Sequence, residues 1–140
     1  MWYFDTSALI PYYRPEPLSD AVQACLLEAE APVSISLLTE TEFASVLARL
    51  VRMNELSVSE ASIIQAAFQE DIHRGCYQVL DLQREHYQLA RDWLLSHDTA
   101  LRTLDALHLA VAALTGSKLI TADKILAKAA NRFSIAVMLF

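Results

Sequence analysis

Residues 2–9 read Trp2-Tyr3-Phe4-Asp5-Thr6-Ser7-Ala8-Leu9, a short aromatic run that ends on an acid. Such a run is typical of a buried β-strand, and we place the first strand at residues 2–5. Pro11 and the turn Pro15-Glu16-Pro17 then break the pattern. Asp5 is unusual because it interrupts a strand that should be buried, and an unpaired buried carboxylate is costly. We therefore expect a cation or a cluster of hydrogen-bond donors beside it.

On the C-terminal side of this segment, short apolar runs alternate with longer stretches in which hydrophobic residues recur at helical spacing. The apolar runs predict four more strands, at residues 33–36, 77–82, 118–121 and 135–140. The longer stretches predict six helices, at residues 18–30, 38–54, 57–73, 84–97, 103–114 and 124–130. Ser57 and Glu60 have the spacing of a capping box at the start of one of these helices.

Strands separated by helices imply βαβ units, and hence a parallel sheet that is covered by helices on both faces. The chain of 140 residues suits one domain, residues 1–140, and its two glycines are too few for a barrel or sandwich of many short strands. In open α/β sheets, ligands bind at the carboxyl ends of the strands, near the point where the strand order reverses. We expect the functional residues at that edge.

Composition limits the class of protein. The chain is 54% hydrophobic and 20% charged, which is typical of a folded domain with a core. The N-terminus lacks the basic region of a signal peptide, and no apolar run approaches the roughly 20 residues of a membrane helix. We therefore expect a cytoplasmic protein. Cys25 and Cys76 lie far apart in apolar contexts, and we expect both to be buried free thiols.

The net charge of −6 at first argues against a nucleic-acid partner, because such proteins usually carry a basic patch. The objection weakens if several acids form one cluster that binds cations, because the remaining surface is then closer to neutral. The positions of the acids are therefore informative.

Four acids lie where the predicted topology can bring them to one edge of the sheet. Asp5 ends the first strand and Asp123 follows the fourth, while Glu42 and Asp105 each lie in the first turn of a predicted helix. Strand ends and helix starts of this kind share one edge of a parallel sheet. The topology thus allows all four carboxylates to line one cleft.

Three of the four acids also have a purely structural explanation. Thr39 and Glu42 have the spacing of a capping box. Thr103 could cap its helix, with Asp105 favoured in the first turn by the helix dipole. Asp123 could cap the last helix. Taken singly, each of these acids is explained as well by capping as by chemistry.

Taken together, the acids indicate a metal site. Three or four carboxylates in one cleft repel one another unless a cation lies among them. Mg²⁺ and Mn²⁺ prefer oxygen ligands, and Mg²⁺ keeps several waters while one or two carboxylates bind it directly. Such a site can deprotonate a water and stabilise the charge of an in-line attack on phosphorus. Neither a histidine base nor a nucleophilic Ser or Cys is then required.

The segments around the four acids resemble the four acidic motifs of PIN domains, in the same order along the chain. They are Tyr3-Phe4-Asp5-Thr6-Ser7-Ala8-Leu9, Ser36-Leu37-Leu38-Thr39-Glu40-Thr41-Glu42-Phe43-Ala44, Leu101-Arg102-Thr103-Leu104-Asp105-Ala106-Leu107-His108-Leu109-Ala110 and Leu119-Ile120-Thr121-Ala122-Asp123. A strand followed by Asp-Thr is common, so any one segment is weak, but the four together are specific. The compact size is most similar to that of VapC toxins from type II toxin–antitoxin pairs.

The resemblance implies a three-layer α/β/α domain with a five-stranded parallel sheet in the order 3-2-1-4-5. It implies endonucleolytic RNA cleavage that leaves a 5′-phosphate. It also implies Mg²⁺ or Mn²⁺ held by four catalytic acids, Asp5, Glu42, Asp105 and Asp123. VapC toxins are usually homodimers, and a VapB antitoxin inserts a segment into the active groove. The helical pair at residues 38–73 would form the dimer and antitoxin groove here. Many relatives have a glycine before the last strand, where this chain departs with Arg132-Phe133-Ser134.

Several polar residues lie beside these acids. We expect Thr6 and Thr121, and less strongly Ser7, to orient a carboxylate or a metal-bound water, with helix capping the equal alternative for the threonines. His108 lies three residues after Asp105 on the same helix face, a spacing that could form a metal pair. It also lies in an apolar stretch, so we expect a hydrogen-bonded histidine of the core.

Four basic residues near the motifs, Arg102, Arg49, Arg52 and Lys124, could contact RNA phosphates, which would make binding depend on salt. Each alone is better explained as solvated helix surface. Arg102 is the strongest of the four because it lies in the loop nearest the acids.

Two other function classes, phosphotransfer domains of two types and catalytically silent scaffolds, fit less well. A phosphotransfer domain that uses Asp5, of the haloacid-dehalogenase type, would have a second Asp where this chain has Ser7. A phosphoacceptor receiver domain would place its central Asp on the third strand, where Asp81 lies, but its other acids have no match. A catalytically silent PIN scaffold that only binds a protein partner would be expected to have lost an acid, whereas all four are present. We therefore expect a metal-dependent endoribonuclease, with the toxin role as the more specific layer.

Overall fold

A computed structural model describes residues 1–140. Five strands form one sheet in the order β3-β2-β1-β4-β5, and every neighbouring pair is parallel. The strands are β1 (Trp2–Phe4), β2 (Val33–Ser36), β3 (Tyr77–Leu80), β4 (Lys118–Thr121) and β5 (Val137–Leu139). The predicted parallel sheet and its strand order are confirmed, although β3 and β5 are shorter than the apolar runs that predicted them.

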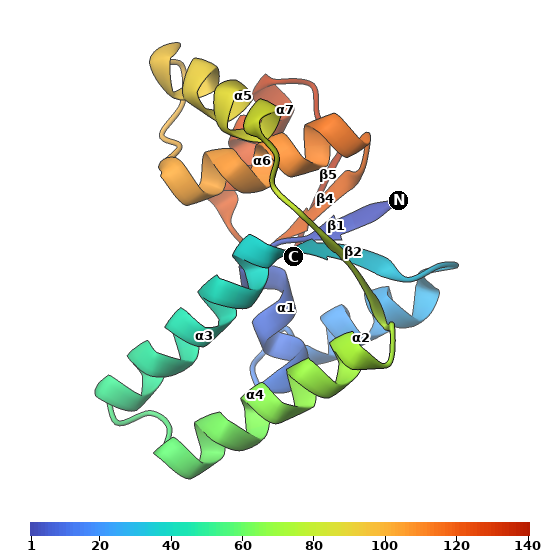
Figure 1. Ribbon diagram of the computed structural model, residues 1–140, viewed down its shortest axis with the longest axis vertical. Helices are drawn as coiled ribbons and strands as arrows, with labels where there is room; N and C mark the ends of the chain where they lie inside the picture. Colours follow the sequence, from blue (N-terminus) through green and yellow to red (C-terminus); the bar gives the residue numbers. More distant parts are fainter.

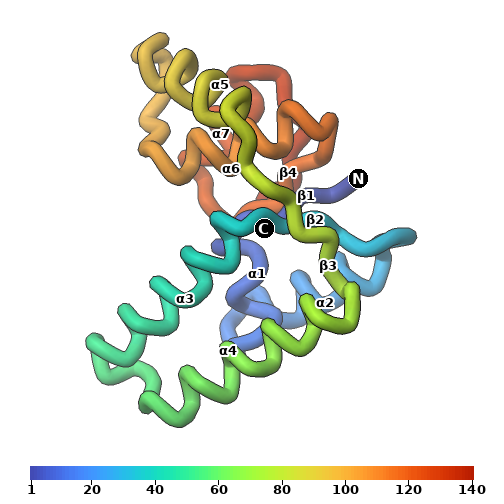
Figure 2. Tube along the Cα trace, viewed as in Figure 1, coloured from blue at the N-terminus to red at the C-terminus, as the bar shows by residue number.

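Seven helices cover the two faces of the sheet, which confirms the three-layer α/β/α arrangement (Figure 1). They are α1 (Thr6–Tyr13), α2 (Ser19–Glu28), α3 (Leu37–Arg52), α4 (Val58–His73), α5 (Arg84–Leu95), α6 (Thr103–Thr115) and α7 (Lys124–Arg132). Helices α1 to α4 lie on one face and α5 to α7 on the other. After α4 the chain passes through β3 and continues to α5 on the opposite face of the sheet (Figure 2).

The core has two halves because alternate residues of a strand point to opposite faces. Tyr3 and Leu119 pack among the side chains of α5, α6 and α7. Phe4 and Ile120 pack on the other face, where α1 to α4 also contribute buried side chains. Asp5 follows Phe4 at the end of β1, so it emerges between the two halves of the core at the edge of the sheet.

The prediction that the chain is broken after the first strand is wrong, because α1 occupies residues Thr6–Tyr13. Pro11 lies inside this helix and is buried. Proline cannot donate a backbone hydrogen bond and is unfavourable in a helix interior. Here the carboxylate of Asp5 caps the helix by accepting the N–H of Ala8, and the apolar side chains of α1 are buried in the core.

The start of α3 also differs from the prediction. Ser36 caps the helix and forms a capping box with Thr39. The expected pair of Thr39 and Glu42 is therefore wrong, and Glu42 lies one turn further into the helix. The capping box of Ser57 and Glu60 at α4 is confirmed.

Five residues adopt the left-handed backbone region: Asn54, Gly75, His97, Gly116 and Ser134. Gly116 ends α6 with φ of 64°, and Ser134 precedes β5 with φ of 57°. Ser134 lies in the segment before the last strand where many PIN domains have a glycine, and its backbone conformation is one that favours glycine. Cys25 is buried as expected, but Cys76 is exposed. None of the helices combines the length and the apolar character needed to cross a membrane.

Candidate active site

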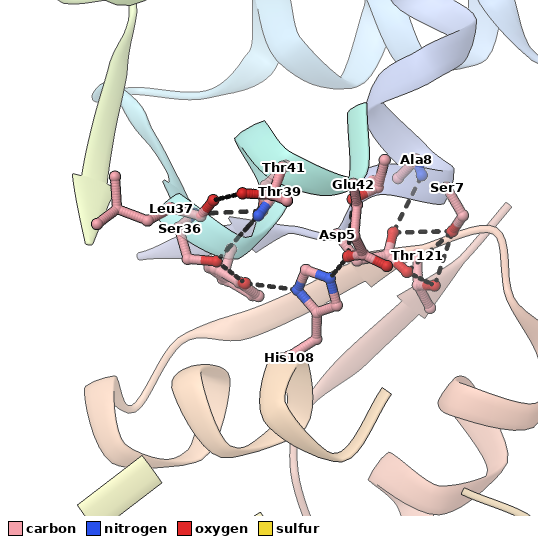
Figure 3. A network of polar contacts seen from close by, with 12 residues as sticks. Asp5, Ser7, Ala8, Ser36, Leu37, Thr39, Thr41, Glu42, His108 and Thr121 are labelled. Atoms are coloured by element: carbon pink, nitrogen blue, oxygen red, sulfur yellow. Dashed lines mark hydrogen bonds and ion pairs between the residues drawn. The ribbon is translucent and has the colours of Figure 1, made fainter. Parts of the chain in front are cut away.

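A cleft of about 810 Å³ lies at the carboxyl ends of β1 and β4. The strand order reverses between these two strands, so the cleft lies where ligands bind in open α/β sheets. The structure brings four acids to its lining: Asp5, Glu42, Asp105 and Asp123. His108 lies among them and extends from α6 toward Glu42 on α3 (Figure 3).

Asp5 is 4% exposed and is held by a cluster of donors. Its Oδ1 accepts hydrogen bonds from the Ala8 N–H at 3.0 Å and the Ser7 hydroxyl at 2.8 Å. Its Oδ2 accepts from the Thr121 hydroxyl at 2.7 Å and again from Ser7 at 2.9 Å. Burial raises the pKa of Asp5, and these donors with the nearby His108 only partly offset that rise. The donor cluster expected beside Asp5 is present.

Glu42 is fixed through one of its two oxygens. Its Oε1 accepts hydrogen bonds from the Thr6 hydroxyl at 3.0 Å and from Nε2 of His108. Burial alone would raise the pKa of Glu42, but the hydrogen bond and charge of His108, with Thr6, outweigh burial and lower it. The prediction that His108 is a hydrogen-bonded core residue is confirmed, since it is 2% exposed and also contacts Tyr3.

Asp123 and Asp105 both contact helix N-termini, as their structural explanations required. Asp123 caps α7 because its Oδ1 accepts the N–H groups of Ile125 at 2.7 Å and Leu126 at 3.1 Å. Asp105 accepts the Arg102 N–H through Oδ2 at 3.4 Å, so α6 is capped at Arg102 and the predicted Thr103 cap is wrong. Burial raises the pKa of Asp105, and repulsion from Asp123 adds to the rise.

The three hydroxyl residues all contact the acids. Thr6 donates to Glu42, and Thr121 donates to Asp5 while it accepts the Asp123 N–H at 3.0 Å. Ser7 contacts both oxygens of Asp5 and accepts the Ala122 N–H at 2.9 Å. Ser7, the weaker candidate in the sequence, therefore links the end of β1 to the loop after β4.

Of the basic residues singled out in the sequence, Arg102 and Arg49 line the cleft and Lys124 does not. Arg52 also lines the cleft, and Arg14 is a lining residue to which the sequence did not point. Arg52 lies three residues after Arg49 on the same helix, and this spacing is a signal for a shared face. Arg14 followed a helix that was not predicted, and it is paired with two glutamates.

The acids fit an open, hydrated metal site better than a closed one. No three side chains of His, Cys, Asp or Glu are gathered closely enough to form a ready-made metal cage. However, Glu42, Asp105 and Asp123 each keep one carboxylate oxygen that has no hydrogen-bond partner, and none of these oxygens is buried. An oxygen-only donor set with one or two direct contacts and several waters suits Mg²⁺ or Mn²⁺.

Comparison with solved structures shows the same fold in several proteins of low sequence identity. The FitAcB structure from Neisseria gonorrhoeae superposes with a TM-score of 0.76 at 21% identity, covering 99% of this chain and 96% of that chain. VapC20 of Mycobacterium tuberculosis, a sarcin-ricin loop cleaving toxin, gives 0.72 at 18% identity, covering 92% and 95%. A toxin–antitoxin complex from Klebsiella pneumoniae gives 0.65 at 20% identity, covering 91% of each chain. No curated protein sequence matches the chain.

The profile of the PIN domain matches residues 2–132. This span includes all four acids and every strand except β5. The strand order and the position of the cleft agree with the arrangement that the sequence motifs implied. The chain therefore belongs to the PIN domain family.

Proposed function

We propose that this protein is a divalent-metal-dependent endoribonuclease and the toxin of a VapBC-type toxin–antitoxin pair. The observation that carries the proposal is the cleft in which one buried carboxylate, Asp5, adjoins three others that each keep an open oxygen. Each of the three acids uses one oxygen for contacts within the protein, which leaves the other oxygen accessible to a ligand in the cleft. Open, charged oxygens beside arginines suit a site that binds a cation and then a phosphate.

Glu42, Asp105 and Asp123 would hold Mg²⁺ or Mn²⁺ through their open oxygens, directly or through waters. Asp5 makes four hydrogen-bond contacts, but the Ser7 hydroxyl makes two of them with one proton, so only three protons are donated, by Ser7, Ala8 and Thr121. A carboxylate can accept about four, so Asp5 can make one further contact. When bound, such a cation makes a water acidic and stabilises the charge that develops on a phosphodiester during in-line attack. The expected product carries a 5′-phosphate.

The residues around the acids supply orientation and substrate contacts. Thr6, Ser7 and Thr121 hold the carboxylates in place, so these do not reorganise when the reaction begins. Arg102 and Arg49 lie in the cleft lining, where they can contact RNA phosphates on either side of the acids. Lys124 lies next to the cleft lining and is a weaker candidate for such a contact.

The toxin role rests on the comparisons. Structures of the same fold include an RNA-cleaving toxin and a toxin–antitoxin complex. We therefore propose a cytoplasmic, homodimeric, single-domain toxin whose partners are RNA and a VapB-like antitoxin. The catalytically silent scaffold and the phosphotransfer domain remain the alternatives, and the test below separates them.

The test is cleavage of total cellular RNA by protein that has been refolded free of any copurified antitoxin. We expect discrete fragments with 5′-phosphate ends in Mg²⁺ or Mn²⁺, and no fragments with EDTA or with Asp5→Asn. Mapping the fragment ends would identify the RNA target. A folded, metal-binding protein that cuts no RNA would contradict the proposal and favour a scaffold, and phosphate incorporation from a small phosphodonor would favour phosphotransfer.

A further inference from the structure

A chain of buried hydrogen bonds leads from the start of α3 through the sheet to Glu42. The Ser36 hydroxyl lies 2.9 Å from the Tyr3 hydroxyl, which lies 2.6 Å from Nδ1 of His108. Nε2 of His108 then contacts Oε1 of Glu42. Tyr3 and Ser36 are fully buried. The network connects residues of β1, β2, α6 and α3, and Tyr3 and His108 are 105 positions apart in the sequence.

Which group donates and which accepts in each of these hydrogen bonds follows from Glu42, at the end of the network. The carboxylate of Glu42 only accepts hydrogen bonds. Nε2 of His108 must therefore carry a proton and donate it. In the neutral ring Nδ1 is then an acceptor and Tyr3 donates to it, whereas in the charged ring both nitrogens donate; Nε2 donates to Glu42 in either state. The Tyr3 oxygen in turn accepts from Ser36, whose hydroxyl also accepts the Thr39 N–H at 3.4 Å. Every member of this network has a hydrogen-bond partner.

The two oxygens of Glu42 are therefore not equivalent. His108 from α6 and Thr6 from α1 both donate to Oε1, so the carboxylate is held from two sides. No protein donor reaches Oε2, and this oxygen is not buried. The side chain thus presents one fixed, open oxygen to the cleft.

We infer that His108, oriented by Tyr3, is a positioning residue that presents Oε2 of Glu42 to the cation in the cleft. The inference rests on the proposed function for the identity of the bound group, and it adds a residue outside the four acids. A histidine that only filled the core would satisfy both ring nitrogens with neutral core partners. Here Nε2 contacts a carboxylate of the cleft, and Nδ1 is hydrogen-bonded to the buried Tyr3 hydroxyl, which orients the ring.

Two substitutions at His108 separate positioning from a structural role. The amide nitrogen of glutamine reaches about as far along the side chain as Nε2 of histidine, so His108→Gln retains the donor to Glu42. Asparagine reaches only as far as Nδ1, so His108→Asn remains a polar core residue that cannot contact Glu42. His97→Asn is the matched control, because His97 is exposed outside the cleft and asparagine tolerates its φ of 58°.

The main measurement is Mn²⁺ affinity, read from the spectroscopic signal of free Mn²⁺, with kcat and KM for RNA on the same variants. We expect His108→Asn to weaken Mn²⁺ binding by about 10- to 100-fold and to lower kcat with little change in KM. His108→Gln and His97→Asn should stay close to the wild-type protein. Equal losses for the Asn and Gln variants that follow their unfolding temperatures would overturn the inference and leave His108 as a core residue.

The two proposals fail in different ways. A wild-type protein that cleaves RNA while its Asn and Gln variants behave alike retains the proposed function and loses the positioning role. A protein that cleaves no RNA, but whose Mn²⁺ affinity follows the expected order, retains the positioning role and loses the nuclease. Absence of Mn²⁺ binding by the wild-type protein would overturn both.

A second readout needs no substitution at His108. In ¹⁵N-labelled wild-type protein, at a pH where the ring is neutral, we expect the nitrogen shifts of His108 to show the tautomer protonated at Nε2. Tyr3→Phe removes the hydroxyl that donates to Nδ1 and should mix the two tautomers and weaken Mn²⁺ binding. A wild-type ring protonated at Nδ1 would overturn the inference, because Nε2 could not then donate to Glu42.

Discussion

Asp5 is a carboxylate placed inside the core, and its protonation affects folding. Burial raises its pKa in the folded protein, so the folded state holds the proton to a higher pH than the unfolded chain does, whose value is near 4. Above the unfolded value, the folded state therefore loses stability as the pH rises, and the full penalty is present above the folded pKa. Asp5→Asn removes the charge and keeps an N-cap for α1.

We expect Asp5→Asn, measured in EDTA near neutral pH, to unfold at a higher temperature than the wild-type protein, by about 3–5 °C or roughly 1 kcal/mol. The difference should shrink as the pH falls toward the unfolded pKa of the aspartate. Thermal unfolding of both proteins across this pH range is the measurement. A variant that is less stable at neutral pH would show that the donors around Asp5 fully compensate its burial.

Thr121 serves two neighbours at once, since it donates to Asp5 at 2.7 Å and accepts the Asp123 N–H at 3.0 Å. Thr121→Val keeps the shape but leaves both partners without this hydroxyl. We expect a loss of about 1–3 kcal/mol in the free energy of unfolding from urea titrations. Thr121→Ser keeps the hydroxyl and should lose less. Equal stabilities of the Val and Ser variants would contradict this account.

At the residue scale, the sequence could locate the acids but not their contacts. Asp5 was identified as a residue in need of donors, because a charge inside an aromatic strand is conspicuous. The contact between His108 and Glu42 joins residues 66 positions apart. No local periodicity carries such information, because it depends on how α3 and α6 pack at the edge of the sheet.

At the element scale, Ser134 and Gly116 occupy the same left-handed backbone region with φ of 57° and 64°. A residue with a Cβ is strained there, whereas glycine is not. We expect Ser134→Gly to raise the free energy of unfolding and Gly116→Ser to lower it, each by about 1 kcal/mol. A Cβ at Gly116 would meet nothing within 4 Å, so the second change tests the backbone alone. A Ser134→Gly variant that is less stable would refute the strain argument.

Helix α1 shows where reasoning from the sequence fails at this scale. Pro11 is an unfavourable residue in a helix, and local propensity therefore predicted a break. Tertiary packing decided otherwise, because α1 buries Ala8, Leu9 and Ile10 against the sheet. Longer helices such as α3 and α4 were predicted within a few residues, since their hydrophobic periodicity extends over several turns.

Helix α3 carries Glu42 near its start and Arg49 near its end, and both line the cleft. If RNA binds along this helix, Arg49→Gln should raise KM and leave kcat little changed. It should also reduce the slope of log affinity against log salt by about 0.7, as expected for one contact to single-stranded RNA. Affinity is measured in an Asp105→Asn background that does not cut the RNA. Arg91→Gln, exposed on α5 outside the cleft, is the control; an equal effect there would indicate general charge loss.

At the scale of the whole molecule, the alternation of strands and helices was enough to predict a parallel sheet with two helical layers. The strand order came from the resemblance to PIN domains, because alternation alone does not fix which strands are neighbours. The shape of the cleft was beyond prediction, since its wall includes Arg14 from the unpredicted α1 region. The net charge of −6 is concentrated in part where four acids meet.

This concentration of charge leads to a prediction about folding and metal together. A cation that binds only the folded state stabilises it by about 2.7 kcal/mol at 100 times its dissociation constant, which corresponds to roughly 10 °C in a chain of this length. We expect Mn²⁺ to raise the unfolding temperature of the wild-type protein by about this amount, and NaCl of equal ionic strength to raise it much less.

The order of stability of the Asp5→Asn variant and the wild-type protein should reverse between EDTA and saturating Mn²⁺. In EDTA the variant lacks the penalty of a buried charge and should be the more stable protein. In saturating Mn²⁺ the wild-type protein should become the more stable one, because the variant has lost one of the carboxylates that we propose as cation ligands. Thermal unfolding of both proteins over a Mn²⁺ titration would show the two curves crossing. Parallel curves would mean that Asp5 contributes nothing to cation binding, and the buried charge would then need a different explanation.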